Sequence, residues 1–147
     1  MIAGPAGDGN VKAVVPFLCV SDMQQSVRYY VEGLGFAIKH QWVVEGKLRW
    51  CWLTLGGAAL MLQEFARQGE NSSAPQGKVG EGVSLYFLCQ DAVSIYDNLR
   101  SRGIEASEPQ VGNRMWVTSL LDPDGYQLHF ESGTDVPEET KLSEVRS

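Results

Sequence analysis

The chain has 147 residues, of which 44% are hydrophobic and 20% are charged, a composition typical of one globular domain and not of a disordered or fibrous chain. Its net charge is -6, from 12 basic and 18 acidic residues, and no cluster of Lys or Arg favours nucleic-acid binding. Nucleic acid is therefore not an expected partner. A membrane is not expected either, because no stretch approaches the roughly 18 apolar residues of a membrane span.

The boundaries of the chain's parts follow from its composition. Residues 1–10 hold three Gly and one Pro and predict a flexible leader that does not resemble a signal peptide. Residues 66–82 are polar, with four Gly, and predict a linker between a first module at 11–65 and a second at 83–131. Residues 132–147 contain no aromatic residue and predict a mobile or loosely docked acidic tail. The two modules are expected to form one domain.

The first module begins with an apolar strand that ends before a helix. Ser21 or Asp22 can cap that helix, with Gln24 or Gln25 completing a capping box. The helix is expected to bury one stripe of apolar side chains: Met23, Val27, Tyr30 and Leu34. Three strands are predicted after it, at 36–44, 47–55 and 58–65, because turn sequences separate these apolar segments.

The second module repeats this order of elements. Asp91 can cap a second helix, whose apolar stripe is Ala92, Ile95, Tyr96 and Leu99. Strands are predicted at 104–109, 115–121 and 126–131, the last two flanking an Asp-Pro-Asp-Gly turn. Asp91 follows Asp22 by 69 residues, and Gly103 follows Gly35 by 68. Each module therefore reads βαβββ, and the repetition indicates a duplicated architecture.

The three cysteines, Cys19, Cys51 and Cys89, are far apart and odd in number. Their spacing does not match a zinc site. Each lies in an apolar run, where a free Cys behaves as a small hydrophobic residue. This usage predicts a reducing, cytoplasmic setting.

Two motifs carry a resemblance to a known family. They are V-S-D-M-Q-Q-S-V-R-Y-Y with L-G-F, within 20–36, and D-P-D-G-Y-Q-L-H-F at 122–130. Residues 11–131 resemble the vicinal oxygen chelate superfamily, which includes glyoxalase I, the fosfomycin and bleomycin resistance proteins and the extradiol dioxygenases. The resemblance implies an α+β fold, with two tandem βαβββ modules forming curved half-barrel sheets and helices on the convex faces.

Enzymes of this superfamily hold a divalent metal with one side chain from each of four strands. By the resemblance, these positions fall on Val15, Leu62, Ser84 and His129. Val15 and Leu62 carry no donor atom, and Ser84 is a poor ligand. A one-residue slip would bring Gln63 or Glu64 near the second position, yet only two donors would then converge, whereas catalytic sites use three. His40, on an outer strand, completes no cluster. We therefore expect no metal, no cofactor and no catalytic residue.

The metal-free bleomycin resistance proteins look closest. They carry V-P, an apolar residue and L before the capping Asp, which is V-P-F-L at 15–18 here, and they can end in a V-H-F-type strand after D-P-x-G, which is L-H-F at 128–130 here. This resemblance implies a homodimer whose N-terminal strand crosses to the partner at Pro16. It also implies two ligand sites at the subunit interface, with His129 in the groove.

The alternation of side chains along each strand predicts which residues line that cleft. The expected ligand-binding residues are Phe17, Trp50, Trp52, Glu64, Tyr86, Arg114, Trp116, His129 and Glu131. The tryptophans offer stacking surfaces for flat or cationic compounds, with Glu64 or Glu131 as the opposite charge, but filling of the core explains them equally well. Arg114 stands where the resistance proteins carry a groove aromatic residue.

Three functions fit these features. The leading hypothesis is a dimer that sequesters a planar or amphipathic small molecule, such as an antibiotic, without chemical change. The alternatives are a metal-dependent enzyme of the glyoxalase or dioxygenase type, and a structural or regulatory dimer with a vestigial cleft. A metal assay separates the first two hypotheses, and ligand quenching of Trp fluorescence separates the first from the third.

Overall fold

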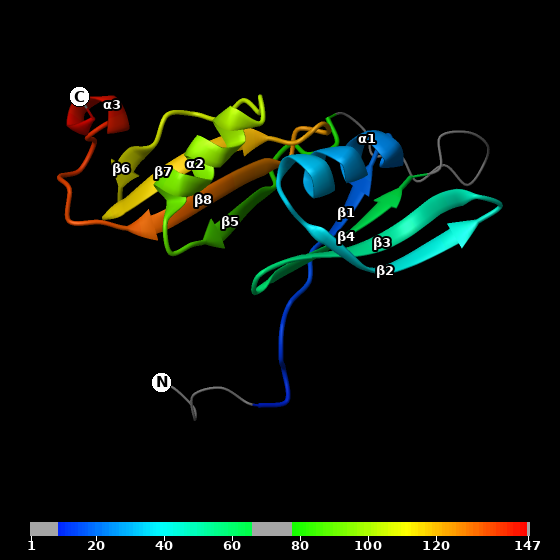
Figure 1. Ribbon diagram of the computed structural model, residues 1–147. Coiled ribbons are helices and arrows are strands. Elements are labelled where there is room, and N and C mark those ends of the chain that lie inside the picture. The colour runs from blue at the N-terminus through cyan, green and yellow to red at the C-terminus, as the bar shows by residue number, and fades with distance from the viewer. Residues whose placement is uncertain (1–8, 66–77, 147) are drawn as a thin grey trace.

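The computed structural model describes residues 9–65 and 78–146 and confirms the repeated βαβββ order (Figure 1). The first module contains β1 (Phe17–Val20), α1 (Met23–Val27), the π-helix η1 (Arg28–Gly33), β2 (Ala37–Val44), β3 (Lys47–Leu55) and β4 (Ala58–Glu64). The second contains β5 (Ser84–Leu88), α2 (Ala92–Ser101), β6 (Gln110–Gly112), β7 (Met115–Leu121) and β8 (Gln127–Gly133), and α3 (Leu142–Val145) follows it. The fold class is therefore α+β, as predicted.

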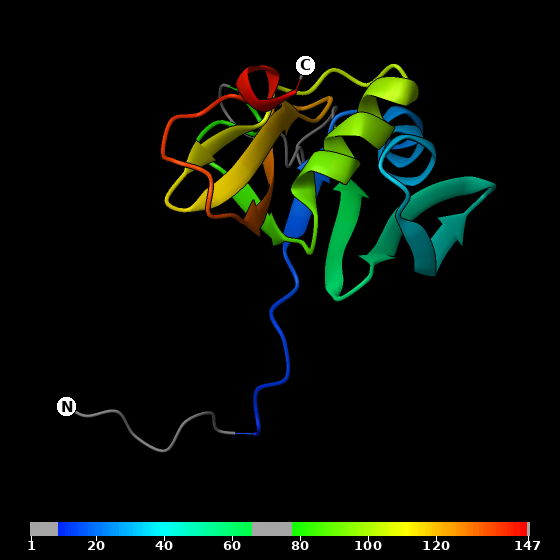
Figure 2. The same ribbon diagram turned by 60° about the vertical axis from the view of Figure 1, so that its left-hand side comes forward.

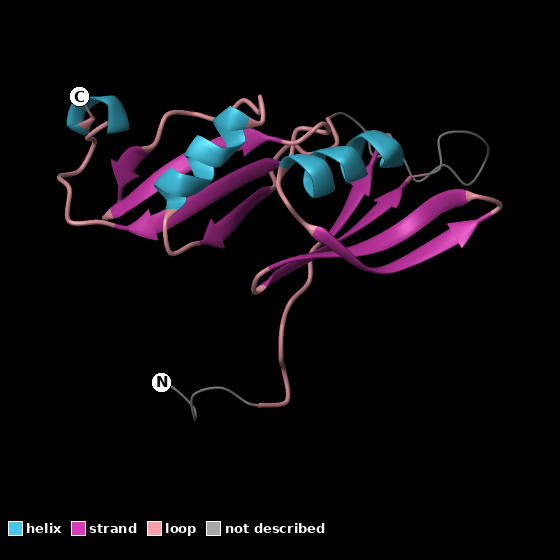
Figure 3. Ribbon diagram, in the orientation of Figure 1, coloured by secondary structure: helices cyan, strands magenta, loops and turns pink. Residues whose placement is uncertain are grey.

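Each module forms one four-stranded sheet of the same topology. The strand orders are β1-β4-β3-β2 and β5-β8-β7-β6. In each sheet the first pair is parallel and the others are antiparallel. The helices α1 and α2 lie on the same side of the two sheets, which leaves the other side of each sheet uncovered (Figure 3). We call these uncovered sides the open faces.

The helices begin at the predicted aspartates. The carboxylate of Asp22 accepts a hydrogen bond from the Gln25 backbone N–H, and Asp91 does the same for Ser94, which satisfies donors that a helix leaves unpaired. Asp22, and not Ser21, is thus the first cap. After Val27 the helix widens into a π-helix, where the Leu34 N–H donates to the Tyr29 carbonyl.

The core lies between the sheets and the helices and is continuous across both modules. Leu18 and Leu62 of the first sheet are buried in the same cluster as Leu128 and Phe130 of the second, with Tyr30 from the helical segment. Burying each such side chain stabilises the fold by roughly 1.5–3 kcal/mol. Side chains from both sheets therefore lie in one core cluster.

A buried carboxylate joins the modules at the Asp-Pro-Asp-Gly turn. Asp122, which is 5% exposed, accepts hydrogen bonds from the Tyr30 hydroxyl at 2.7 Å and from the backbone N–H groups of Asp124 and Tyr126. The Tyr126 hydroxyl donates to the Cys19 carbonyl of β1 at 2.8 Å. Burial, first of all, raises the pKa of Tyr126 to about 12, so this hydroxyl stays a donor at neutral pH.

Gly80 packs directly against this turn. A Cβ atom at Gly80 would lie 2.2 Å from the Tyr126 backbone nitrogen and 2.4 Å from the Gly125 carbonyl carbon, and backbone atoms cannot yield as a flexible side chain can. We expect Gly80→Ala to destabilise the protein by about 1–3 kcal/mol, as other overpacked sites do. Gly112→Ala is the matched control, since its Cβ would meet nothing within 4 Å. Equal urea midpoints for the two variants would contradict this packing.

Two expectations for the second module need correction. The strand predicted at 104–109 is absent, and the edge strand is the shorter β6. The buried Pro109 ends that predicted segment and has no N–H for a ladder. Within the predicted loose tail, residues 134–146 pack on the second module: Leu142 is buried beside Tyr96, and Arg146 binds Asp97 through two hydrogen bonds of 3.0 and 2.8 Å.

The N-terminal residues leave the body as an extended arm. The arm leaves the body just before β1, where the Pro16 carbonyl still accepts the Met61 N–H at 2.8 Å, and runs away from both sheets (Figures 1 and 2). Val14 in this arm is 88% exposed. Most of the predicted leader, and residues 66–77 of the predicted linker, lie outside the described residues. No helix in the described part of the chain is long and apolar enough to cross a membrane.

Candidate functional site

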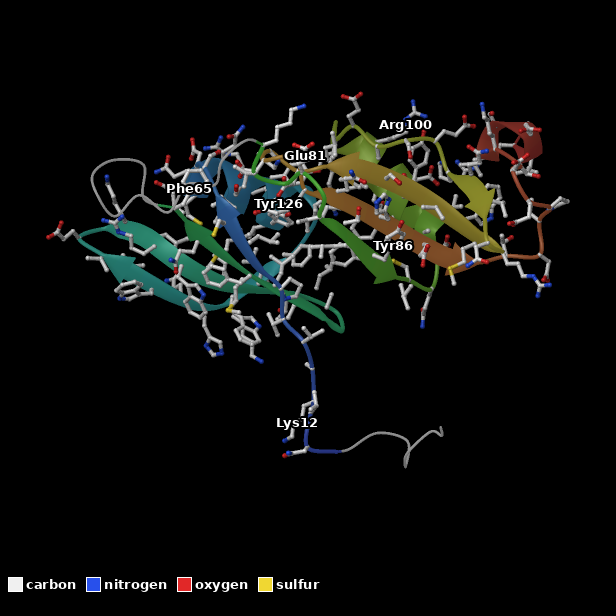
Figure 4. The ribbon with its side chains drawn as sticks, turned by 180° about the vertical axis from the view of Figure 1, so that it is seen from behind. Lys12, Phe65, Glu81, Tyr86, Arg100 and Tyr126 are labelled. Atoms are coloured by element: carbon white, nitrogen blue, oxygen red, sulfur yellow. The ribbon has the colours of Figure 1, made fainter. Side chains whose placement is uncertain are left out.

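The open faces of the two sheets carry most of the predicted ligand-binding residues. In the first sheet, register places Phe17 beside Met61 and Met61 beside Trp52. In the second sheet, the equivalent row is Tyr86, His129 and Ser119. Figure 4 shows the molecule from behind, with the helices beyond the sheets and Tyr86 on β5.

His129 is the most constrained polar group on the open face of the second module. Its Nδ1 lies 2.7 Å from the Ser119 Oγ, and the Tyr86 ring stacks on the imidazole with centroids 4.4 Å apart and planes 20° apart. Its Nε2 is buried and has no hydrogen-bond partner among the described residues. A buried polar atom without a partner costs about 1–3 kcal/mol, so this nitrogen is a candidate ligand contact. Glu131, half-buried, follows on the same strand and the same face.

The open face of the first module is an aromatic surface. Trp50 pairs across strands with Trp42, and Trp52 pairs with His40. The rings of His40 and Trp52 meet edge to face, with centroids 6.0 Å apart. Trp42 is 58% exposed. Large flat side chains of this kind present stacking area at little entropic cost.

Both open faces also expose apolar side chains that are normally buried. Phe17 is about half exposed, Tyr86 is 60% exposed and Leu88 is 75% exposed. Exposed apolar patches on a soluble protein mark surfaces that bind ligands or other proteins. The open faces are therefore the best candidate for a functional surface.

Three predicted site residues lie elsewhere. The Oε2 atom of Glu64 accepts the Met23 backbone N–H at 2.8 Å, on the helix side of β4. Trp116 is 9% exposed and packs in the core with Tyr96 and Leu142, which answers the question of core or cleft for this tryptophan. Arg114 occupies the turn between β6 and β7, where its backbone N–H donates to the Glu138 carboxylate at 2.9 Å.

One of the family's four ligand positions, Leu62, lies on the opposite face of its strand from the one predicted. Leu62 was expected on the open face, but it is fully buried under the helices. Met61 and Gln63 occupy the open face of β4 instead, because side chains alternate along a strand and β4 is displaced by one residue from the expected register.

The residues at these positions do not fit a divalent metal. His129 has an imidazole nitrogen to offer, but Val15 and Met61 have no ligand that a hard cation accepts, and Ser84 has only a hydroxyl. In the described part of the chain, no three His, Cys, Asp or Glu side chains gather closely enough to hold a metal ion.

Two cavities adjoin the sheets. One, of about 740 Å³, runs between the modules beside Tyr86 and Leu88 and is mostly apolar, with Val14 and Pro16 of the N-terminal arm in its wall. A larger one, of about 840 Å³, lies on the helix side between α1 and β3 and contains only Glu64 of the predicted site residues. The first contains only Tyr86 of the predicted site residues, and core residues such as Leu60 and Phe130 form much of its wall, so it borders the open face of the second module at Tyr86 and Leu88 alone.

Comparison with known proteins agrees with this architecture. The model of the Glyoxalase/Bleomycin resistance protein/Dioxygenase superfamily matches residues 11–130. No curated protein sequence matches the chain.

Solved structures share the fold at low sequence identity. TioX from Micromonospora sp. ML1 superposes with a TM-score of 0.67 at 17% identity, covering 84% of this chain and 99% of TioX. TnmS3, an antibiotic binding protein from Streptomyces sp. CB03234, gives a TM-score of 0.61 at 19% identity, covering 84% of this chain and 98% of its own. A glyoxylase/bleomycin resistance protein/dioxygenase domain from Frankia sp. EAN1pec gives a TM-score of 0.66 at 21% identity, covering 86% of this chain and 96% of its own.

Proposed function

Because the chain belongs to the Glyoxalase/Bleomycin resistance protein/Dioxygenase superfamily, we propose that it binds and sequesters a flat or amphipathic small molecule without a metal. The observation that carries this proposal is the pair of open faces. Where a metal enzyme of the family would present donors, this chain presents exposed aromatic and apolar side chains around one histidine. Such a surface holds a ligand by stacking and burial.

The proposed site is a cleft at the interface of a homodimer. Each open face is a half-barrel without a cover, and exposed Phe17, Tyr86 and Leu88 need a partner surface. The N-terminal arm supports the same arrangement, since it leaves the body with Val11 and Val14 exposed. A second copy would bury these side chains and close the cleft from the other side.

Antibiotics are the ligand class that we favour. One structure with the same fold is described as an antibiotic binding protein, and many antibiotics carry the flat rings that a tryptophan surface can stack. The free cysteines Cys19, Cys51 and Cys89 support a reducing, cytoplasmic site of action.

The assembly is tested by sedimentation of the purified chain. We expect a dimer at micromolar concentration, and we expect Leu88→Lys to shift it to monomer by placing a charge in the interface. Val145→Lys is the control, because Val145 is also exposed but lies in α3 on the far side of the second module. A monomeric wild-type chain would contradict the interface cleft.

A further inference from the structure

The charge of the aromatic surface differs from what the sequence predicts. A planar cation was expected, with Glu64 or Glu131 as its counter-charge. Glu64 instead lies on the helix side of β4 and caps α1 through the Met23 N–H at 2.8 Å. This carboxylate is therefore unavailable to a ligand on the open face of the first module.

A cation of the protein already occupies the aromatic surface. The Lys39 ammonium lies over the Trp52 ring at 6.0 Å from its centroid, close enough for a cation–π attraction. His40 contacts the same ring edge to face. A cationic ligand would have to displace Lys39 and overcome its repulsion, whereas an anionic ligand would gain a partner.

The Trp52 indole adds an unused hydrogen-bond donor. Its Nε1 is buried and has no partner among the described residues. Indole N–H groups donate and never accept, so a ligand can satisfy this atom only with an acceptor such as a carboxylate or phenolate oxygen. Lys39 and His40 lie against the ring from exposed positions in β2, and such side chains can turn aside on binding.

Among the described residues, the other strands of this face bring no opposing negative charge to it. The side chains that alternate onto it from β1, β3 and β4 are apolar or neutral: Phe17, Cys19, Trp50, Trp52, Thr54, Met61 and Gln63. The local charge is thus positive although the chain as a whole carries -6. Local charge, and not net charge, decides which ligand a cleft concentrates.

We infer that the open face of the first module takes a flat aromatic ligand that bears an anionic oxygen. The ring stacks on Trp50 and Trp52, the anion pairs with the Lys39 ammonium, and the Trp52 Nε1–H donates to an acceptor oxygen. This inference rests on the proposed binding function and adds to it the charge class of the ligand.

Three probes with one ring system test the inference by calorimetry on the full chain at pH 7.5: naphthalene carboxylate, naphthalene methanol and naphthylmethylammonium. We expect the carboxylate to bind up to about fivefold tighter than the neutral alcohol, the range of an exposed ion pair, and the ammonium to bind weakest. Lys39→Glu should reverse this order. High salt should reduce the differences, because it screens exposed charges.

Lys47→Glu is the matched control, because it makes the same charge change in the same hairpin but lies in the wall of the helix-side cavity. It should keep the order of the wild type. The charge inference is overturned if the ammonium binds tighter than the carboxylate, or if Lys39→Glu leaves the order of the three probes unchanged. Binding of the neutral alcohol upholds the proposed function in either case. If none of the probes binds, both proposals fail.

Discussion

Replacing Trp116 with alanine is expected to cost about 3–5 kcal/mol of folding free energy, the range for a large aromatic side chain removed from a core. Trp116 is 9% exposed and contacts Tyr96 of α2, Val111 of β6 and Leu142 of α3 within one cluster. Its loss leaves a cavity beneath the helix of the second module. Urea unfolding of the variant measures this cost.

Trp50→Ala is the comparison that separates core from cleft. Trp50 lies on the open face of the first module, so its truncation should leave the fold nearly as stable. The affinity for a flat aromatic ligand should instead fall by about 1–3 kcal/mol, as at other binding hot spots. If Trp50→Ala unfolds the protein, or if Trp116→Ala changes affinity at unchanged stability, the assignment of the two faces is wrong.

Replacing Asp122 with alanine is expected to cost about 3 kcal/mol or more. The change removes the acceptor of the Tyr30 hydroxyl and of two backbone N–H groups, at Asp124 and Tyr126, and each donor left buried without a partner costs about 1–3 kcal/mol. Asp135→Ala, at an exposed aspartate, should have little effect. Similar melting temperatures for the two variants would show that the turn does not join the modules.

The same carboxyl should make stability depend on pH. Burial, above all, raises the pKa of Asp122 above its ordinary value. In the unfolded chain the Asp122 carboxyl ionises as the pH rises through about 3.9, whereas in the folded protein it stays protonated until the pH passes the raised pKa. The protonated group therefore contributes stability at low pH, and this contribution is lost progressively as the pH rises from the lower pKa to the raised one. Asp122→Asn, which does not ionise, should gain stability relative to the wild type across that window. Parallel stability curves for the two proteins would contradict this.

The sequence predicted the modules because their signals are local. Asp22 and Asp91 cap helices, and glycine turns separate apolar strands, so the order of elements could be derived without tertiary contacts. The pairing of modules in space is different. Asp122 and Tyr30 are 92 residues apart, and no local sequence pattern predicts that the Asp122 carboxylate accepts a hydrogen bond from the Tyr30 hydroxyl.

The faces of the strands were predicted less well, because a one-residue error in counting along a strand exchanges its two faces. His129 pairs with Tyr86 and Met61 pairs with Phe17, so a repeat distance of 68 residues links Met61 with His129. Applying that distance, already present between Gly35 and Gly103, would have corrected Leu62 to Met61. The same shift explains why Glu64 faces the helix.

Trp42 was missed for a similar reason. A regular hairpin closed by Glu45 and Gly46 would set Trp42 opposite Arg49, but a bulge between Trp42 and Val43 sets it opposite Trp50. Bulges insert one residue and reverse the faces that follow. Sequence alternation alone therefore could not find the pair of tryptophans on the open face.

Ligand binding before and after removal of metal shows whether the open faces bind without a metal ion. The protein is dialysed against EDTA, and naphthalene methanol is titrated by calorimetry before and after dialysis. We expect the same affinity in both states, because stacking on the open faces needs no metal and the donor set there does not fit one. Loss of binding on dialysis, with recovery when Ni(II), Zn(II), Mn(II) or Fe(II) is added back, would contradict this expectation.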